Sequence, residues 1–291
     1  MHTLLKKARN KILREINHIS FLKAQSELAY RATLEKHRSN LPALSTPDLA
    51  LLKTLQEEGA VITSLESLSI PSTGQMLQAA ERLRPEIPKS ISGDKNEYVV
   101  HATNQQIMEH PEIFMWGLQE RLLNIVENYI GLPVAYHGVY FRRDIANEVE
   151  QTSRLWHLDK EDRKVLKVIL YLNDVMDDIG PFQYIPQSLT PAIASSLNYN
   201  YGYIKDPTMQ EYVSPSDYKS CTGPAGTVVI AGTASIFHRG KVPFSGDRFA
   251  LFFDYTSKQP FTNYSSLPEK DLLLLANKYF SQEQKDYVFL Q

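Results

Sequence analysis

The hydrophobic pattern of the chain changes near residue 134, and this change constrains its fold more than any other feature. Before it, apolar residues recur at the three- to four-residue spacing of amphipathic helices. After it come short apolar and β-branched runs, broken by Gly, Pro, Asn and Asp. These runs are VAYHGVYF, KVLKVILYL, PFQYI, GTVVIAG, ASIFH and RFALFFDY. Helices followed by a β-rich body predict a mainly β protein (α+β) in which helices flank a jelly-roll barrel, rather than a doubly wound sheet.

The expected helices have residues that favour their starts or ends. Thr46 can cap a helix that has Pro47 in its first turn and ends near Gly59. A capping box formed by Ser266 and Glu269 predicts a single closing helix. Helices are expected over residues 46–59, 72–84, 111–131 and 266–279, with a short strand over 60–63.

The N-terminal 40 residues are strongly basic, with nine Lys/Arg against three Glu. Apolar residues recur there at helical spacing, at Leu5, Ala8, Ile12, Ile16 and Ile19. This pattern predicts a basic amphipathic helix. Such a helix packs on the outside of the core or contacts anionic lipid or a partner protein, and packing is its more common role. We therefore divide the chain into a basic helical extension, 1–45, and one domain with the β-rich body and its flanking helices, 46–291.

Composition excludes several classes of protein. The net charge of −2 argues against nucleic acid or an acidic membrane as the main partner. The single cysteine, Cys221, excludes an internal disulfide framework and suits a reducing compartment. The sequence contains neither a run of about 20 apolar residues nor the apolar core of a signal peptide. These features predict a cytoplasmic protein, with peripheral membrane contact through residues 1–40 as the alternative.

Two histidines and an aspartate form a candidate metal site. His157 and Asp159 are two residues apart, so on an extended backbone both side chains point to one face. His238 supplies a second imidazole, and two imidazoles with one carboxylate are typical of non-haem Fe(II), with three coordination positions left open. The pair alone is a weak signal, because a surface histidine bonded to a neighbouring carboxylate looks the same. A similar pair, His110 and Glu112, lies at a helix start, where the two side chains splay apart.

Arg248 strengthens the case for this site. It follows His238 by ten residues, across a turn that contains Pro243 and Gly246, and begins the strand 249–252. A hairpin there would bring its guanidinium near the metal, where the far carboxylate of a cosubstrate needs a bidentate partner. The alternative is a solvated arginine at the end of a strand.

Five segments resemble motifs of the phytanoyl-CoA dioxygenase family, over about residues 46–260. They are Trp156-His157-Leu158-Asp159, Leu170–Val175, Gly180-Pro181-Phe182 with Ile185–Ser188, His238-Arg239-Gly240, and Gly246-Asp247-Arg248. The resemblance implies a double-stranded β-helix, with Fe(II) held by His157, Asp159 and His238. It also implies that 2-oxoglutarate chelates the iron and that Arg248 pairs with its distal carboxylate. Such enzymes consume O2, release succinate and CO2, and usually hydroxylate a C–H bond.

The chain departs from the family pattern at three positions. Gln187 replaces a glycine, Leu189 stands where many members have a histidine, and Ile179 replaces a frequent asparagine before Gly180. None of these three positions is a metal ligand in the family. The differences are therefore expected to change the wall of the substrate site and to leave the metal ligands in place. The retained Asp159 argues against a halogenase, because the related halogenases lack this carboxylate.

The substrate side of the site is expected in residues 190–222, a long connection rich in tyrosine. We predict that it forms a lid, with Tyr199, Tyr201 and Tyr203 contacting substrate. The alternative is that these tyrosines only pin the segment to the barrel. Tyr140 and Arg142 share one face of the preceding strand and would contact 2-oxoglutarate or substrate if that face is inward. The sequence leaves the substrate open, as a small-molecule or lipid-like compound.

Two other functions fit the same barrel. One is a jelly-roll binding protein without turnover, which would need neither a complete triad nor a placed arginine. The other is a cupin-type metalloenzyme that does not use 2-oxoglutarate. Cupin sites usually carry more histidines, and Arg248 would then have no role.

Overall fold

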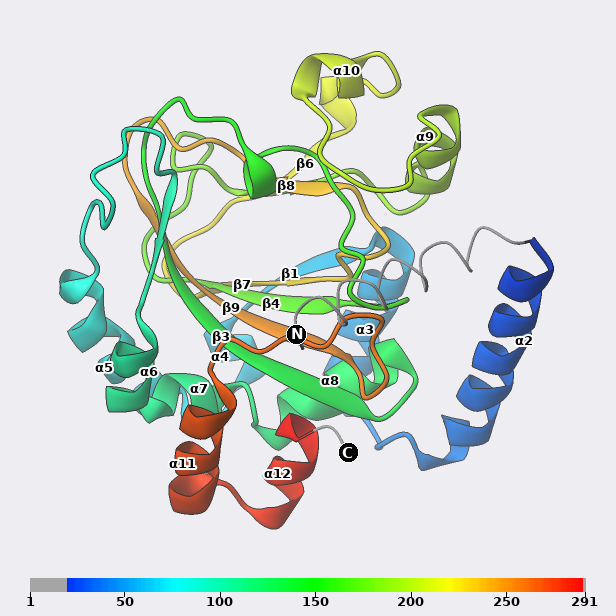
Figure 1. The fold of residues 1–291 in the computed structure, drawn as a ribbon, viewed down its shortest axis with the longest axis horizontal. Helices are drawn as coiled ribbons and strands as arrows, with labels where there is room; N and C mark the ends of the chain where they lie inside the picture. The colour runs from blue at the N-terminus through cyan, green and yellow to red at the C-terminus, as the bar shows by residue number, and fades with distance from the viewer. Residues whose placement is uncertain (1–19, 290–291) are drawn as a thin grey trace, which may run out of the picture.

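Two antiparallel sheets form the centre of the protein in the computed structural model, which describes residues 20–289 (Figure 1). The large sheet has the strand order β1-β7-β4-β9-β3-β2, and the small sheet has the order β6-β5-β8. The strands are β1 (Ala60–Ser64), β2 (Val99–His101), β3 (Val134–Asp144), β4 (Leu166–Tyr171), β5 (Phe182–Tyr184), β6 (Lys219–Cys221), β7 (Thr227–Ala231), β8 (His238–Gly240) and β9 (Arg248–Ser257). The small sheet lies opposite the large one in Figure 1, an arrangement consistent with the predicted jelly roll.

Most helices cover the face of the large sheet that points away from the small sheet, whereas α9 and α10 lie beside the small sheet (Figure 1). Short 3-10 turns stand at residues 38–40, 84–86, 152–154 and 215–217. The α-helices are α2 (Ser20–His37), α3 (Thr46–Glu58), α4 (Leu65–Leu68), α5 (Thr73–Leu83), α6 (Asn104–Glu109), α7 (Pro111–Trp116), α8 (Glu120–Ile130), α9 (Thr190–Ser196), α10 (Asp206–Gln210), α11 (Glu269–Tyr279) and α12 (Gln282–Val288).

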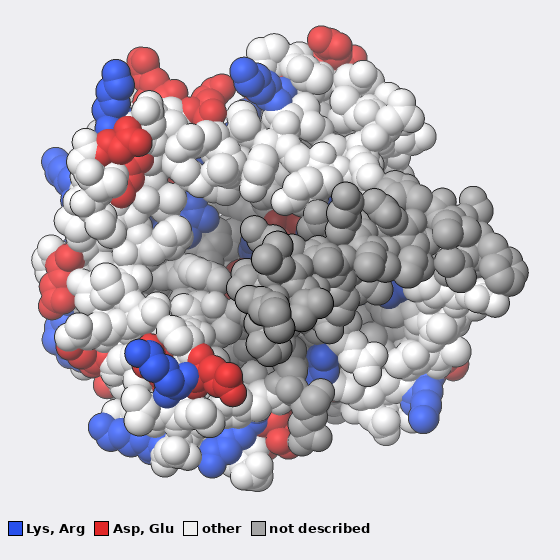
Figure 2. Space-filling view, viewed as in Figure 1, with Lys and Arg blue, Asp and Glu red and all other residues white. Residues whose placement is uncertain are grey.

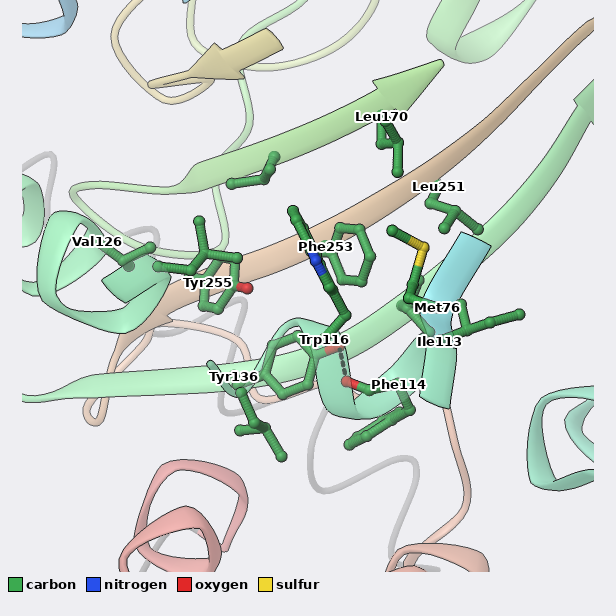
Figure 3. Packing of buried hydrophobic residues seen from close by; sticks show 14 of the residues in the cluster. Met76, Ile113, Phe114, Trp116, Val126, Tyr136, Leu170, Leu251, Phe253 and Tyr255 are labelled. Carbon is green, nitrogen blue, oxygen red and sulfur yellow. Dashed lines mark hydrogen bonds between the residues drawn. The ribbon is translucent and has the colours of Figure 1, made fainter. Parts of the chain in front are cut away.

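Alternation along the strands gives the large sheet two different faces. Leu251 and Phe253 of β9 face the helices, where the ring of Phe253 lies 4.9 Å from that of buried Trp116 (Figure 3). Phe252 and Ala250 of the same strand face the small sheet and pack in a separate apolar cluster. The main core therefore lies between the large sheet and its helices, and the space between the sheets holds a smaller apolar cluster beside polar and charged side chains.

The helix expected over 111–131 is two helices, α7 and α8, with a break at residues 117–119. The break lies where two tyrosines of the large sheet meet the chain. The hydroxyl of Tyr255 donates to the carbonyl of Gly117 at 2.8 Å, and a Cβ at residue 117 would clash with the ring of Tyr136. These contacts come from strands more than 15 residues away in sequence, so helical spacing alone could not reveal the break.

Three further expectations are corrected at helix ends. The cap of α3 is Ser45, whose side chain accepts a hydrogen bond from the backbone N–H of Asp48, and Thr46 is already helical. The expected capping box at Ser266 is wrong, because α11 begins after Pro268 without a side-chain cap. A second closing helix, α12, follows and has a capping box of its own, formed by Ser281 and Gln284.

The segment 190–222 contains more regular structure than expected, since it includes α9, α10 and β6. The run Ala234–Phe237, expected as a strand, forms none, and the strand β8 begins only at His238.

The basic N-terminal pattern at residues 5–19 lies outside the described residues, so its role stays a prediction. The helix that follows, α2, packs Tyr30 and Leu34 against the core, and His37 lies 2.8 Å from a carboxylate oxygen of Glu127. Within residues 20–289, no helix has the length and apolar character needed to span a bilayer.

Candidate metal centre

The structure brings His157, Asp159 and His238 together between the two sheets. One potential ligand atom from each lies within 4.8 Å of the others. The backbone holds this arrangement, because the N–H of each histidine donates to the carbonyl of the other, at 3.1 and 3.0 Å. The N–H of Asp159 donates to the carbonyl of Thr233 at 3.1 Å. Residues 81 positions apart in the chain thus become cross-strand neighbours.

Both imidazole rings are oriented by their Nδ1 atoms. Nδ1 of His157 lies 2.8 Å from the carbonyl oxygen of Leu155, and Nδ1 of His238 lies 3.2 Å from that of Ile236. Because a carbonyl only accepts, each Nδ1 carries the proton and each Nε2 keeps its lone pair. Burial lowers the pKa of His157, and it lowers the pKa of His238 to about 3. Both rings are therefore neutral, which is the form that binds metals.

The third group, Asp159, is ionised although it is buried. Burial by itself would raise the pKa of its carboxyl, but the ammonium of Lys167 and the two neighbouring histidines together outweigh this effect and hold the pKa below its usual range. Nζ of Lys167 lies 2.8 Å from one carboxylate oxygen of Asp159.

This set of donors fits a divalent first-row metal. Nε2 of His157 lies 3.7 Å from one carboxylate oxygen of Asp159, and Nε2 of His238 lies 3.8 Å from the other. Two neutral imidazoles and one carboxylate are the facial set that suits Fe(II), and they leave coordination positions for other ligands. His110, by contrast, forms the junction between α6 and α7 and is not part of this cluster.

A cavity beside the three residues is rich in positive charge. Its cationic lining residues come from four different strands, so the local sequence around the histidines does not predict it. The lining consists of Arg142, Ser153, His157, Lys167, Phe182, His238, Arg239, Gly240, Arg248 and Phe252. Such a cavity suits an anion.

Arg248 reaches this cavity by a different route from the one expected. β8 belongs to the small sheet and β9 to the large sheet, so the chain crosses between the sheets and forms no hairpin. The guanidinium is only 2% exposed, so Arg248 is not a solvated strand end. Its Nη2 lies 2.9 Å from a carboxylate oxygen of Asp144, and Nη1 donates to the carbonyl of Gly180.

Asp144 joins two arginines of the cavity. Its second oxygen accepts from Nη2 of Arg142 at 2.8 Å. Burial would raise the pKa of Asp144, but the two arginines lower it to about 2, and the carboxylate stays charged. Arg142 also stacks over Phe252 at 4.6 Å, and its Nε has no hydrogen-bond partner among the described residues.

Tyr140 and Arg142 both lie on the inward face of β3, the condition on which their predicted role depends. Arg142 lines the cavity. Tyr140 packs against the apolar cluster between the sheets instead and is not among the cavity-lining residues.

A second cavity is lined by His157 and Asp159. Tyr201 and Tyr203 line it and are 64% and 50% exposed, with the ring of Tyr203 5.2 Å from that of His157. The remaining lining residues are Leu158, Lys160, Glu161, Gly202 and Thr262. This wall is mainly polar.

Tyr199 has a different position from the other two tyrosines. Its hydroxyl donates to the carbonyl of Gly202 at 2.7 Å and accepts from the backbone N–H of Leu158 at 3.2 Å. It therefore pins the segment next to Asp159, as the alternative interpretation expected, whereas Tyr201 and Tyr203 lie at the cavity.

Asp206 of α10 anchors the same segment and had no signal in the sequence. One of its carboxylate oxygens accepts from Nε1 of Trp156 at 2.9 Å and pairs with Arg239 at 3.0 Å. The guanidinium of Arg239 also lies 4.4 Å from the Trp156 ring. Because Trp156 and Arg239 are the chain neighbours of His157 and His238, this contact ties the segment to both histidines.

On the face shown in Figure 2, the described residues have no comparable concentration of charge. Figure 2 shows Lys and Arg intermixed with Asp and Glu over one face, where the described residues form no extended patch of one sign.

Comparisons with known proteins identify the fold. No protein-family model and no curated protein matches the chain. Among solved structures, the epimerase SnoN from nogalamycin biosynthesis, in complex with Fe3+, alpha ketoglutarate and nogalamycin RO, matches with a TM-score of 0.50 and 14% identity over 75% of this chain and 86% of that chain. EctD from S. alaskensis with 2-oxoglutarate and 5-hydroxyectoine matches with a TM-score of 0.49 and 17% identity, over 74% of this chain and 76% of that chain. HygX from Streptomyces hygroscopicus with nickel and 2-oxoglutarate matches with a TM-score of 0.48 and 15% identity, over 74% of this chain and 88% of that chain. The likeness to SnoN shows that the two chains share a fold.

Proposed function

We propose that the protein is an Fe(II)- and 2-oxoglutarate-dependent oxygenase whose iron is held by His157, Asp159 and His238. The observation that carries this proposal is a set of neutral imidazoles and an ionised carboxylate beside a cationic cavity. The fold shared with SnoN supports it, as does the resemblance to the phytanoyl-CoA dioxygenase family. When bound, Fe(II) with 2-oxoglutarate supplies the oxidation chemistry of this class, in which O2 is consumed and succinate and CO2 are released.

The cationic cavity is the proposed site for 2-oxoglutarate. Arg248 and Arg142 would bind its distal carboxylate, because Asp144 holds both guanidinium groups in fixed positions. The Nε–H of Arg142 is a buried donor that has no hydrogen-bond partner among the described residues. Tyr140 would act at most by supporting Arg142 from the same strand.

The second cavity is the proposed entrance for the substrate. Tyr201 and Tyr203 stand at its rim and Tyr199 fixes the segment that carries them. The polar lining favours a small molecule with hydrogen-bonding groups over a purely apolar chain. Hydroxylation of a C–H bond is the outcome that we propose.

Anaerobic addition of Fe(II) and 2-oxoglutarate to the purified protein tests the proposal. We expect the weak visible charge-transfer band of the chelate, and succinate once air is admitted. A protein that shows neither would be a binding protein or a metalloenzyme of another kind, and the proposal would be wrong.

A substrate is first identified by its stimulation of succinate formation. Tyr203→Ala is expected to raise the KM for that substrate by about tenfold. The ring stands beside His157 at the cavity, and loss of an aromatic contact with a ligand costs on the order of 1 kcal/mol or more. Fe(II) binding should not change. Tyr212→Ala is the matched control, since Tyr212 is 41% exposed in the same segment but does not line the cavity. Equal KM values for the two variants would contradict a lid.

A further inference from the structure

Lys167 is a charged residue of the centre that neither the sequence motifs nor the proposed function accounts for. It lies on the inward face of β4, where it is paired with Ala231 on β7 and with Asp254 on β9. A lysine at this position interrupts a face that otherwise carries Ile169 and Tyr171. Its side chain is 21% exposed and forms part of the wall of the cationic cavity.

The ammonium stands between two sets of charges. On one side it lies 2.8 Å from an oxygen of Asp159, with the carboxylates of Asp254 and Glu161 also near enough to raise its pKa. On the other side it shares the cavity with Arg142 and Arg248. Lys167 is thus a direct neighbour of both the proposed metal ligand and the proposed cosubstrate site.

We propose that Lys167 sets the balance between the two ligands of this site: its ammonium weakens the binding of the divalent cation and strengthens the binding of 2-oxoglutarate. This inference rests on the proposed function. A fixed positive charge repels a dication bound to the other oxygen of Asp159, and it competes for the charge of that carboxylate. The same fixed charge attracts a dianion that enters the adjoining cavity. The two effects have opposite signs because one charge faces both ligands.

A purely structural role predicts a different result. If Lys167 only held Asp159 in place, its removal would misplace a ligand and weaken both metal and 2-oxoglutarate binding. The directions of the two changes therefore separate the alternatives, whatever their size.

The experiment uses Lys167→Met in the full-length, metal-free protein, with calorimetric titration of Mn(II) and then of 2-oxoglutarate into the Mn(II)-loaded protein. We expect Mn(II) to bind tighter by on the order of tenfold and 2-oxoglutarate to bind weaker by on the order of tenfold. Lys164→Met is the matched control, because that ammonium donates to the carbonyl of Tyr129 at 2.6 Å, outside the cavity. Both dissociation constants of the control should equal those of the wild type.

Several results would overturn the inference. Weaker binding of both ligands would show a structural role, and unchanged constants would show no role. If Lys167→Met does not fold, as judged by circular dichroism and thermal melting, Lys167→Gln takes its place with the same expectation, since it keeps a hydrogen-bond donor without the charge. A wild-type protein that binds Mn(II) but not 2-oxoglutarate would contradict the proposed function, and this inference would fail with it.

Discussion

His157→Ala is expected to abolish Fe(II) binding at the proposed centre and to lower succinate formation at least about a thousandfold. Loss of an outer hydrogen-bond partner of a metal ligand already costs roughly 10–100-fold, and here a ligand itself is removed. The backbone bridge to His238 does not need the side chain, so the fold should persist. Metal binding is measured by calorimetry with Mn(II), and activity by succinate release.

His110→Ala is the control for this variant. His110 belongs to the similar-looking pair with Glu112, but it stands at the junction of α6 and α7 and away from the cluster. Its metal binding should equal that of the wild type. If His157→Ala keeps full metal affinity, the three residues are not the metal centre.

Arg248→Met is expected to have two large effects. The side chain is fully buried and pairs with Asp144, so its loss leaves a buried carboxylate with Arg142 as its remaining partner. Breaking a buried pair from one side costs on the order of 3 kcal/mol of folding stability. Loss of one partner of a charge pair also weakens ligand binding by roughly 2–5 kcal/mol, so 2-oxoglutarate should bind about a hundredfold weaker.

The double variant Asp144→Asn/Arg248→Met separates these effects. Removing the carboxylate charge that Arg142 alone then balances should restore part of the lost stability, measured by thermal or urea unfolding, while 2-oxoglutarate binding stays weak. If the double variant also regains 2-oxoglutarate affinity, Arg248 acts only through the fold and not as a ligand of the cosubstrate. Arg248→Met should bind Mn(II) as the wild type does, which distinguishes it from His157→Ala.

Most strands could be predicted because they depend on local pattern, but the short strands β2 and β6 were not expected. Five of the six apolar runs after residue 134 contain strands, and the short strand after Gly59 is present as β1. Alternation placed Arg142 and Tyr140 on one face, as the structure shows. The run Ala234–Phe237, which was expected as a strand, forms a turn instead.

The candidate site could be predicted only in part, for the same reason. His157, Asp159, His238 and Arg248 have a recognisable order in the chain, and the structure places all four around one region. Asp144 and Asp206 have no such signal, since each acts through a partner that lies far away in sequence. Lys167 is closer to Asp159 in the chain, but their contact depends on how β4 lies against the segment that carries Asp159.

The sequence by itself determined which residue types were available: two imidazoles, a carboxylate, an arginine and a set of strands with one apolar face. Only the tertiary structure decided their surroundings. It placed β8 and β9 in opposite sheets, so that Arg248 meets Asp144 and the cavity instead of folding back in a hairpin. It also set Lys167 against Asp159. Long-range strand pairing decides such contacts. The pKa and the interaction energy of a buried charged group depend on the groups that surround it in space, and the spacing of residues along the chain does not reveal those groups.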